Sequence, residues 1–550
     1  MRNIVKITLW DKTVGYIKWD DASWKNTGSI FQFDKEFVRS GLDISPILMP
    51  VKSQLVQKNI PQHFNNPKDT FRGLPPVFAQ SLPDHWGTSI FNAWAKKNLT
   101  GKTTPVDMLS FIGTRGMGAL EYHPSIIKGD NEAFDVDVNR LYDFAKQILA
   151  ERTDPEFNAD EELLWQDLIK LGTSPGGKRP KALIAINKNS GSVKSGQAEL
   201  PPGYEHFILK YDNETDTFQY AKVEYAYYLL CQKCGIKMTE TALRRFDTAT
   251  HFITKRFDRL SNKKIHMQSL RAMTGGCRSY EDALAVTKKL NLNYSDTEQL
   301  YRMMVFNVLS GNIDDHDNNF SFLMDETGTW RLSPAYDMIY SIDPSLSDFQ
   351  KGQFMSVNGK VSEISADDML KVARTFDIKS PERIIENTLD SISCLPKILS
   401  GLDVIPKVTG MITNELNKKH KSLGAKYSQT VPEIKTSADD IMSKVSTEFE
   451  RKTIIKIKDK FPEKEVTFLA IKKLLTKGKH SGTLFKIEVD KKKKTFVSDN
   501  QTKDISYTNG HYNLGEFHEA QTWKTINGKQ AAYTPTRVMS LENKKKFGIN

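Results

Sequence analysis

The stretch Gly311-Asn-Ile-Asp-Asp-His-Asp-Asn-Asn-Phe-Ser321 carries the most information about the fold of this chain. Within it, Asp314 is followed five positions later by Asn319, and Asp337 comes eighteen positions further on. Phosphoryl transfer uses such parts, because one carboxylate takes the proton of the acceptor hydroxyl while an amide and a second carboxylate hold Mg²⁺. Protein kinases have the same Asp-x-x-x-x-Asn spacing in their catalytic loop. Here, however, Ile313 replaces the usual Arg.

The flanking sequence predicts how these residues are held. A mostly apolar helical run stops at Ser310-Gly311. Two short strands are predicted on either side of the turn sequence Asp325-Glu-Thr-Gly328. This hairpin would bring Asp337 back beside Asn319, with Asp314 on the loop that enters it.

Two other interpretations of this stretch stay open. An acidic, Asn-rich surface turn has the same composition. A calcium-binding loop is the second, because Asp314, Asp315, Asp317 and Asn319 all carry hard oxygen donors. The Gly and the terminal Glu of an EF-hand loop are absent, however.

Further parts of a kinase site lie upstream. The strand-like run 205–211 carries Lys210 near its end, and the helical stretch 220–234 carries Glu224. In kinases a strand lysine binds the nucleotide phosphates, and a helix glutamate fixes that lysine. The segment Gly172-Thr-Ser-Pro-Gly-Gly-Lys-Arg-Pro-Lys181 precedes them, and its adjacent glycines let the backbone approach a phosphate closely. It matches neither Gly-x-Gly-x-x-Gly nor the Walker A pattern.

Together these segments resemble the HipA-type serine/threonine kinases, the toxins of bacterial toxin–antitoxin pairs, over residues 4–423. Four family motifs occur in the expected order, at Thr173–Lys181, Arg256–Arg259, Asp314–Ser321 and Arg331–Asp337. Three N-terminal segments also fit the family, at residues 10–19, 82–85 and 109–120. Gly113, Gly116 and Gly118 are therefore assigned to turns of an N-terminal module rather than to a nucleotide loop.

The resemblance implies a role for each matching residue. Asp314 would be the catalytic base. Asn319 and Asp337 would hold Mg²⁺, and Lys210, fixed by Glu224, would bind the phosphates of ATP. Other ATP contacts are implied for loop and hinge residues, namely Ser174, Gly176, Gly177, Lys178, Lys255, Arg256, Phe257 and His316. A structural role in the loop is the alternative for His316, and the extra carboxylates of Asp315 and Asp317 would either tighten metal binding or repel phosphate.

The resemblance also implies regulation and partners. Thr173 or Ser174 would be autophosphorylated, which adds a charge of roughly −2 and competes with ATP for the loop amides. The protein substrate could be an aminoacyl-tRNA synthetase, and a helix-turn-helix antitoxin would be the partner. A small-molecule phosphotransferase is one alternative function. A nucleotide-binding pseudokinase that regulates through nucleic acid is the other.

Composition points to a chain of several domains in the cytoplasm. The 550 residues include only four Cys, so a disulfide framework is not expected. No apolar run approaches the roughly 20 residues that cross a bilayer, and residues 1–10 do not resemble a secretory signal. Cys231 and Cys234 are best explained as core residues on one helix face, because no second pair is present to hold zinc.

Positive charge is concentrated near the C-terminus. Residues 436–550 hold 23 Lys/Arg and 14 Asp/Glu, a net charge of +9 out of +11 for the whole chain. Helices are expected at 441–460 and 465–475, followed by a hairpin whose turn carries Lys491, Lys492, Lys493 and Lys494. This region is either a winged-helix-like nucleic-acid binder or a small interaction domain with a solvated turn, and the second is slightly favoured.

The expected fold class is α+β, a protein-kinase-like bilobal fold. A β-rich N-terminal module covers 1–125, and an N-lobe with the phosphate loop and strand lysine covers 126–262. A helical C-lobe with the catalytic loop covers 263–424. A linker at 425–438 leads to a small basic α+β domain at 439–550.

Overall fold

The computed structural model describes residues 4–21, 27–66, 70–83, 85–127, 133–141, 143–144, 159–171, 181–212, 218–246, 249–343, 345, 351–424 and 427, and five strands within 485–533. The chain forms two compact units. The first contains residues 1–404 and 411–431, and the second contains 405–410 and 432–550. Helix and sheet are mixed, as the expected α+β class requires.

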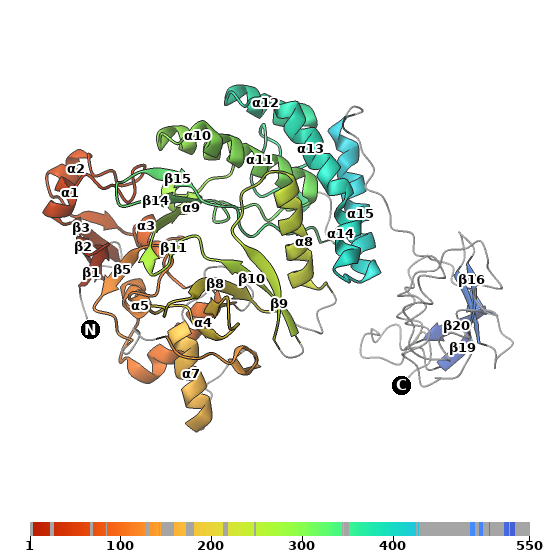
Figure 1. The fold of residues 1–550 in the computed structure, drawn as a ribbon, viewed down its shortest axis with the longest axis horizontal. Coiled ribbons are helices and arrows are strands. Elements are labelled where there is room, and N and C mark those ends of the chain that lie inside the picture. Colours follow the sequence, from red (N-terminus) through yellow and green to blue (C-terminus); the bar gives the residue numbers. More distant parts are fainter. Residues whose placement is uncertain are drawn as a thin grey trace. The chain divides into compact units, whose positions relative to one another are not determined.

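An antiparallel sheet of order β4-β3-β2-β1-β5 begins the first unit. Its strands are β1 (Val5–Leu9), β2 (Lys12–Asp20), β3 (Gly28–Phe33), β4 (Gln62–Phe64) and β5 (Leu120–His123). Five helices accompany it, namely α1 (Lys35–Arg39), α2 (Gln54–Gln57), α3 (Pro76–Ala79), α4 (His85–Asn98) and α5 (Pro105–Ile112). Figure 1 shows β1, β2 and β3 in red with α1 and α2 beside them. These helices accompany the sheet because its buried face needs to be covered.

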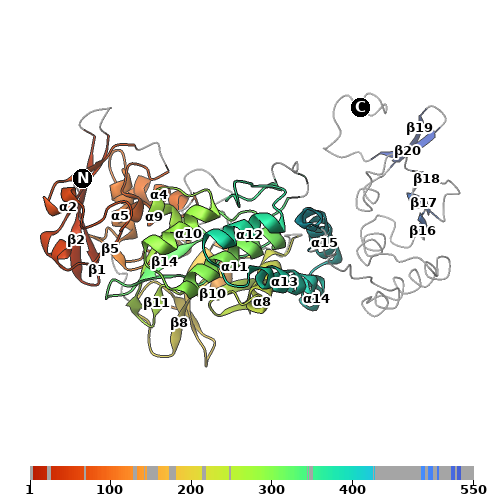
Figure 2. The same ribbon diagram turned by 90° about the horizontal axis from the view of Figure 1, so that it is seen from above.

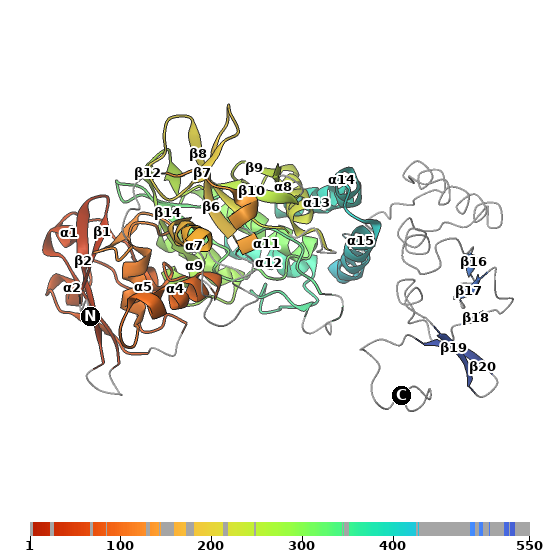
Figure 3. The ribbon, with the colours of Figure 1, turned by 90° about the horizontal axis from the view of Figure 1, so that it is seen from below.

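A second antiparallel sheet has the order β7-β6-β8-β10-β9. Its strands are β6 (Lys181–Asn187), β7 (Val193–Ser195), β8 (Tyr204–Lys210), β9 (Thr241–Phe246) and β10 (Ala249–Lys255). Helix α8 (Tyr220–Lys233) contacts β9 and β10, and α7 (Ala159–Leu171) contacts β6, as Figure 3 shows. The five central residues of β6 are buried, as expected for an interior strand of a covered sheet.

The remainder of the first unit is mostly helical. The two small sheets pair β11 (Arg259–Leu260) with β12 (Lys263–Lys264), and join β13 (His266–Ser269), β14 (Ser321–Met324) and β15 (Trp330–Leu332). The helices are α9 (Leu270–Thr274), α10 (Tyr280–Lys289), α11 (Tyr294–Ser310), α12 (Ala366–Thr375), α13 (Pro381–Ser393), α14 (Leu395–Gly401), α15 (Pro406–His420) and the 3₁₀ turn η2 (Lys421–Leu423). Helix α11 contacts α10 and α13 (Figure 2). It is buried along most of its length, so it forms the centre of this region.

Contacts between distant segments join the N-terminal sheet to the small sheets. The amide of Gly118 donates to Asp258 Oδ2 at 2.7 Å, and the Arg259 guanidinium donates back to Gly118 O at 2.9 Å. Trp10 Nε1 donates to Lys264 O at 2.8 Å. Met324 of β14 is fully buried in the core of the N-terminal sheet. These segments therefore share one hydrophobic core.

The second unit is described through its strands. One sheet joins β16 (Phe485–Val489), β17 (Lys494–Ser498) and β18 (Ile505–Ser506), and another pairs β19 (Thr522–Ile526) with β20 (Lys529–Tyr533). The antiparallel pair β16–β17 confirms the predicted hairpin, with Val489 opposite Lys494. The predicted helices at 441–460 and 465–475 lie outside the described residues, as do Lys491, Lys492 and Lys493, so the winged-helix interpretation stays a prediction.

Two further predictions concern cysteines and membranes. Cys231, Cys234 and Cys277 are buried and Cys394 is exposed, and all four are free thiols. Burial raises the pKa of Cys231, which fits the core-packing interpretation of the Cys-x-x-Cys pair. Among the helices of the described ranges, none combines the length and apolar character needed to cross a bilayer.

Candidate active site

An ion cluster lies at the end of β8. Lys210 is the last residue of that strand, and its Nζ donates to Glu224 of α8 and, at 2.5 Å, to Asp337 Oδ1. Phe252 of β10 is opposite Lys210 in the sheet register, and its ring centre lies 5.5 Å from the ammonium. Two carboxylates and an aromatic face hold this lysine in one place. The three residues predicted to meet from separate segments therefore do meet.

The charges in the cluster are unevenly distributed. The neighbouring Lys210 holds the pKa of Asp337 well below its usual range, and burial only partly opposes this. Burial raises the pKa of Glu224 even though Lys210 acts in the opposite direction. Burial would lower the pKa of Lys210, but the charges of Asp337 and Glu224 outweigh it and raise that pKa. Asp337 is therefore the firmly ionised carboxylate of the pair, as a cation ligand must be.

Asp337 also has an unusual backbone. Its φ is +57°, in the left-handed region that Asp tolerates better than most residues. Tyr336 precedes it and donates to Asn318 O at 2.6 Å, which ties this segment to the loop that carries Asn319. The predicted return of Asp337 toward the catalytic loop is thus achieved by a turn just after the β14–β15 hairpin.

The candidate catalytic loop follows α11 directly. This helix ends at Gly311, whose φ of 74° is left-handed, so the predicted helix stop is confirmed. The hydroxyl of Ser341 accepts hydrogen bonds from the amides of Ile313 and Asp314 at 2.8 and 3.0 Å. Asn319 Nδ2 donates to Asp314 O at 2.8 Å. The backbone of Asp314 is therefore fixed, while 69% of its side chain is exposed to receive an acceptor.

His316 lies near Asp314 and acts electrostatically on Asp337. Its Nε2 is 3.9 Å from Asp314 Oδ1, and its charge contributes to lowering the pKa of Asp337. The ring also meets Phe354 edge to face, with ring centres 5.8 Å apart. This position fits both interpretations made for His316, because it packs within the loop and also faces the cluster.

Asp315 and Asp317 do not face the cluster. Asp315 is fully buried and accepts from Tyr280 Oη at 2.6 Å, while Asp317 is 2% exposed and accepts from Arg271 Nε at 2.6 Å. Each also accepts a backbone amide, from Phe354 and Cys277 respectively, both at 2.7 Å. Because these carboxylates point to separate sets of donors, they neither converge on one ion nor approach a phosphate. This geometry does not fit a calcium-binding loop. It also gives Asp315 and Asp317 no part in tightening metal binding or in repelling phosphate.

Asn319 and Asp337 are the residues suited to hold a metal ion. The Nδ2 of Asn319 is used on Asp314 O, so its Oδ1 is the amide atom suited to a cation. One amide and one carboxylate fit Mg²⁺, which takes few protein ligands and completes its shell with phosphate oxygens and water. Among the described residues, no group of three or more His, Cys, Asp or Glu side chains is placed to bind a metal by itself.

The predicted hinge residues lie at the end of β10. Lys255 Nζ donates to Glu205 at 2.6 Å, and the Arg256 guanidinium is buried against Asp258 at 2.8–2.9 Å. These side chains are therefore engaged within the protein, and any nucleotide contact from them would come from the backbone. The Phe257 ring lies 5.5 Å from that of Tyr336, which places the hinge beside the Asp337 segment.

The phosphate loop lies outside the described residues, and with it Thr173, Ser174, Gly176, Gly177 and Lys178. Lys181, which follows this loop, is a site residue that the sequence analysis did not single out. It opens β6 directly opposite Lys210 in the register, so both side chains leave the same face of the sheet. Its charge also contributes to lowering the pKa of Asp337. The signal was present in the sequence, since Lys181 ends the Pro-Lys element of the loop motif.

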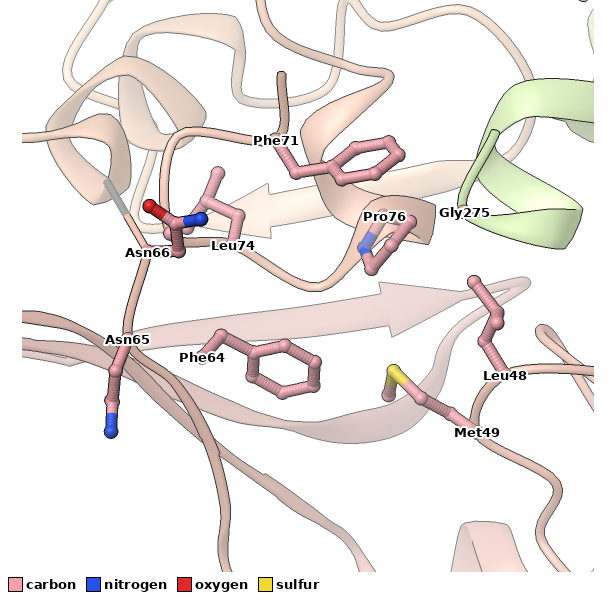
Figure 4. A pocket seen from close by; sticks show the side chains of 10 residues that line it. Leu48, Met49, Phe64, Asn65, Asn66, Phe71, Leu74, Pro76 and Gly275 are labelled. Carbon is pink, nitrogen blue, oxygen red and sulfur yellow. The ribbon is translucent and has the colours of Figure 1, made fainter. Parts of the chain in front are cut away.

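A separate pocket of about 400 Å³ lies in the N-terminal region (Figure 4). Met49, Phe64, Phe71 and Leu74 make it mostly apolar, and Gly275, just after α9, closes one side. None of the predicted site residues lines it. It is therefore distinct from the ion cluster.

Comparisons with known proteins match both halves of the first unit. The family model described as the HipA N-terminal domain matches residues 5–123, and the one described as the HipA-like C-terminal domain matches residues 173–396. A candidate kinase named Y4mE, from Sinorhizobium fredii, is 22% identical over 252 residues, or 42% of this chain. That match spans 57% of the length of Y4mE.

A solved structure shows a similar fold. HipA of Shewanella oneidensis MR-1, solved with HipB and its operator DNA, superposes with a TM-score of 0.54 at 14% sequence identity. The match covers 78% of this chain and the whole of that one. At this level of identity the likeness concerns the fold.

Proposed function

Because the chain belongs to the HipA-type family, we propose that it is a serine/threonine protein kinase that uses ATP and Mg²⁺. The observation that carries this proposal is the meeting of Lys210, Glu224 and Asp337 next to a loop that presents Asp314. Protein kinases use a strand lysine, a helix glutamate, a metal-binding aspartate and a loop aspartate in this arrangement.

The contacts of these residues support the role proposed for each of them. Asp314 orients the acceptor hydroxyl and takes its proton, which its exposed carboxylate and fixed backbone support. Lys210 binds the nucleotide phosphates, and Glu224 limits where its ammonium can go. Mg²⁺, held by Asn319 and Asp337, would neutralise the charge of the phosphates.

The remaining nucleotide contacts rest on the sequence. Backbone amides between Ser174 and Lys178 would cover the phosphates, and the backbone at 255–257 would face the adenine. Lys181 adds a second cation on the face of the sheet that carries Lys210. The sheet around β8 would be the N-lobe of a bilobal kinase and the helices around α11 its C-lobe, with the domain limits given above.

Regulation and biological role also follow as proposals. Autophosphorylation at Thr173 or Ser174 would place a phosphate where the nucleotide phosphates bind, and so would turn the kinase off. The protein would act as a growth-inhibiting toxin, with an aminoacyl-tRNA synthetase as its substrate. The solved HipA carries HipB and operator DNA, so we expect a helix-turn-helix antitoxin partner here. DNA would be reached through that partner or through the basic C-terminal unit with Lys491–Lys494.

The test is incubation of the purified protein with Mg²⁺ and γ-labelled ATP, alone and with a bacterial proteome fraction. Label should enter protein, and Asp314→Asn should lower the rate by about 10²–10⁴-fold. Asp337→Asn should abolish labelling by removing a metal ligand. Asp367→Asn is the matched control, because Asp367 is exposed on α12 and pairs only with the surface residues Lys371 and Arg374 in the described structure.

Three results would count against the proposal. Equal labelling of wild type and Asp314→Asn would remove Asp314 from the chemistry. Label that appears on metabolites rather than on protein would favour a small-molecule phosphotransferase. Intact ATP binding without any transfer would favour a pseudokinase regulator.

A further inference from the structure

The carboxylate of Asp315 sits in an unusual environment for a charged group. It is fully buried and directly follows the candidate base Asp314. Its oxygens accept from Tyr280 Oη at 2.6 Å, Gln353 Nε2 at 3.0 Å and the amide of Phe354 at 2.7 Å. A buried carboxylate needs such donors, and it also needs a compensating positive charge nearby.

Lys419 of α15 supplies that charge through one intermediate. Its Nζ donates to Gln353 Oε1 at 2.8 Å, and Gln353 Nε2 donates to Asp315 Oδ2 at 3.0 Å and to Asn312 O at 3.0 Å. An ammonium can only donate and a carboxylate can only accept. Gln353 must therefore point its Oε1 at Lys419 and its Nε2 at Asp315. The ammonium of Lys419 thus fixes the orientation of the Gln353 amide.

The same network reaches the backbone of the candidate base. Asn307 Nδ2 donates to Tyr280 Oη at 3.0 Å, and Asn312 Nδ2 donates to Asn307 Oδ1 at 3.0 Å. Ser341 Oγ contacts Asn312 Oδ1 at 3.4 Å and accepts from the amide of Asp314 at 3.0 Å. A continuous series of hydrogen bonds thus runs from Lys419 to Asp314.

The position of α15 is itself fixed beside this loop. His420 Nε2 lies 2.8 Å from Leu309 O, in the last turn of α11. Glu415 Oε2, one helical turn before Lys419, lies 3.4 Å from Lys351 Nζ, close in sequence to Gln353. Contacts of Glu415 and His420, on either side of Lys419 in the sequence, therefore hold Lys419 next to the loop.

We propose that Lys419 is a positioning residue for the candidate catalytic base: through Gln353 and Asp315 it holds the loop in the conformation that presents Asp314. This inference rests on the proposed kinase function. It assigns to the last helix before the C-terminal region a role in placing the base, without contact to substrate.

The first variant is Lys419→Met, which keeps much of the side-chain volume and removes the charge. We expect kcat to fall roughly tenfold, the equivalent of about one well-placed hydrogen bond, while KM for ATP stays within about twofold. Lys421→Met is the matched control, because Lys421 lies two residues after Lys419 and is exposed. It should leave both constants unchanged.

Gln353→Leu is the second variant, in case the first does not fold. Gln353→Leu interrupts the same series of hydrogen bonds, so it should lower kcat by a similar factor. The double variant should lose no more of kcat than either single variant. Additive losses in the double variant would overturn the proposal. So would a change in KM for ATP with kcat intact.

The effect of pH on these variants separates a charge effect from a loss of packing. Burial lowers the pKa of Lys419 to about 8, with Asp315 opposing it. The groups that face the series are Asp315, Tyr280, Glu415 and Lys351. The ratio of wild-type to Lys419→Met rates should therefore shrink from about ten at pH 7 toward one at pH 9.5, where Lys419 of the wild type has lost its charge and position 419 is neutral in both proteins. A constant ratio would overturn the proposal.

A final measurement does not depend on activity. Hydrogen exchange of the amides of Ile313 and Asp314, both bonded to Ser341, should speed up at least tenfold in Lys419→Met and not in Lys421→Met. If the wild type transfers no phosphate but this difference is found, the kinase proposal fails and the positioning of the loop stands. Unchanged exchange would overturn the positioning role itself.

Discussion

Replacing Lys210 with Met tests the ion cluster in isolation from any activity. The side chains of Lys210 and Glu224 are 14% and 9% exposed, so they form a buried pair, and Lys210 also bonds Asp337. Removing one partner of a buried pair leaves an uncompensated charge and lowers the free energy of unfolding by about 3–5 kcal/mol. We expect this loss at pH 8, well above the ordinary pKa values of the two remaining carboxyl groups.

The loss should be smaller in acid. Without Lys210, burial and the charge of Asp337 both favour protonation of Glu224. Protonation removes the unpaired charge, and each unit of further rise in the Glu224 pKa returns about 1.4 kcal/mol. The difference between wild type and variant should therefore shrink by about 1–2 kcal/mol at pH 5.5. Groups that titrate identically in both proteins cancel from this difference.

The assay is urea unfolding followed by tryptophan fluorescence at pH 8 and pH 5.5. Lys188→Met is the control, because Lys188 pairs with Glu205 and Glu240 at 2.8 Å but is 48% exposed. Such a pair should contribute less than about 1 kcal/mol. A loss below about 1 kcal/mol for Lys210→Met, or an equal loss at both pH values, would refute this account of the cluster.

Two further predictions concern stability. Burial lowers the pKa of the fully buried His266 to about 4, so the unfolded chain binds the extra proton between pH 6.5 and 4. The free energy of unfolding should therefore fall by about 2 kcal/mol from pH 7 to 5 because of this residue. His266→Leu should remove that part of the pH dependence, whereas the control His63→Leu, at an exposed position, should leave it in place. Asp258→Ala should lower the unfolding free energy by about 3–5 kcal/mol in the same urea assay, because the guanidinium groups of Arg256 and Arg259 would remain buried without their shared anion. A loss under 1 kcal/mol would mean that backbone carbonyls alone are enough for these arginines.

Features that depend on neighbouring residues were predictable from the sequence. The end of α11 at Gly311 and the β14–β15 hairpin follow from a helix stop and a turn that lie next to them in the chain. The meeting of Lys210 and Glu224 depends on a strand followed by a helix, which the apolar pattern indicated. These predictions agree with the structure because each feature is specified by residues that are close together in the sequence.

The side chains that were misjudged depend on distant partners. Asp315 and Asp317 stand in an acidic run that reads as a metal or phosphate site, yet their partners lie 35 and 46 residues upstream, at Tyr280 and Arg271. The spacing of charges along a loop does not tell which carboxylate turns inward.

The shared core of the first unit has a consequence for dividing the chain. Met324 of β14 fills the core of the N-terminal sheet, and Trp165 of α7 lies in a core with Phe91 and Phe111. A fragment ending at residue 127 would expose both apolar surfaces, and so would the fragment that begins after it. Each fragment alone should aggregate. When both are produced in one cell, they should associate and restore the complete first unit. The gene could therefore be split at this point to give a two-part reporter whose assembly depends on both halves being present.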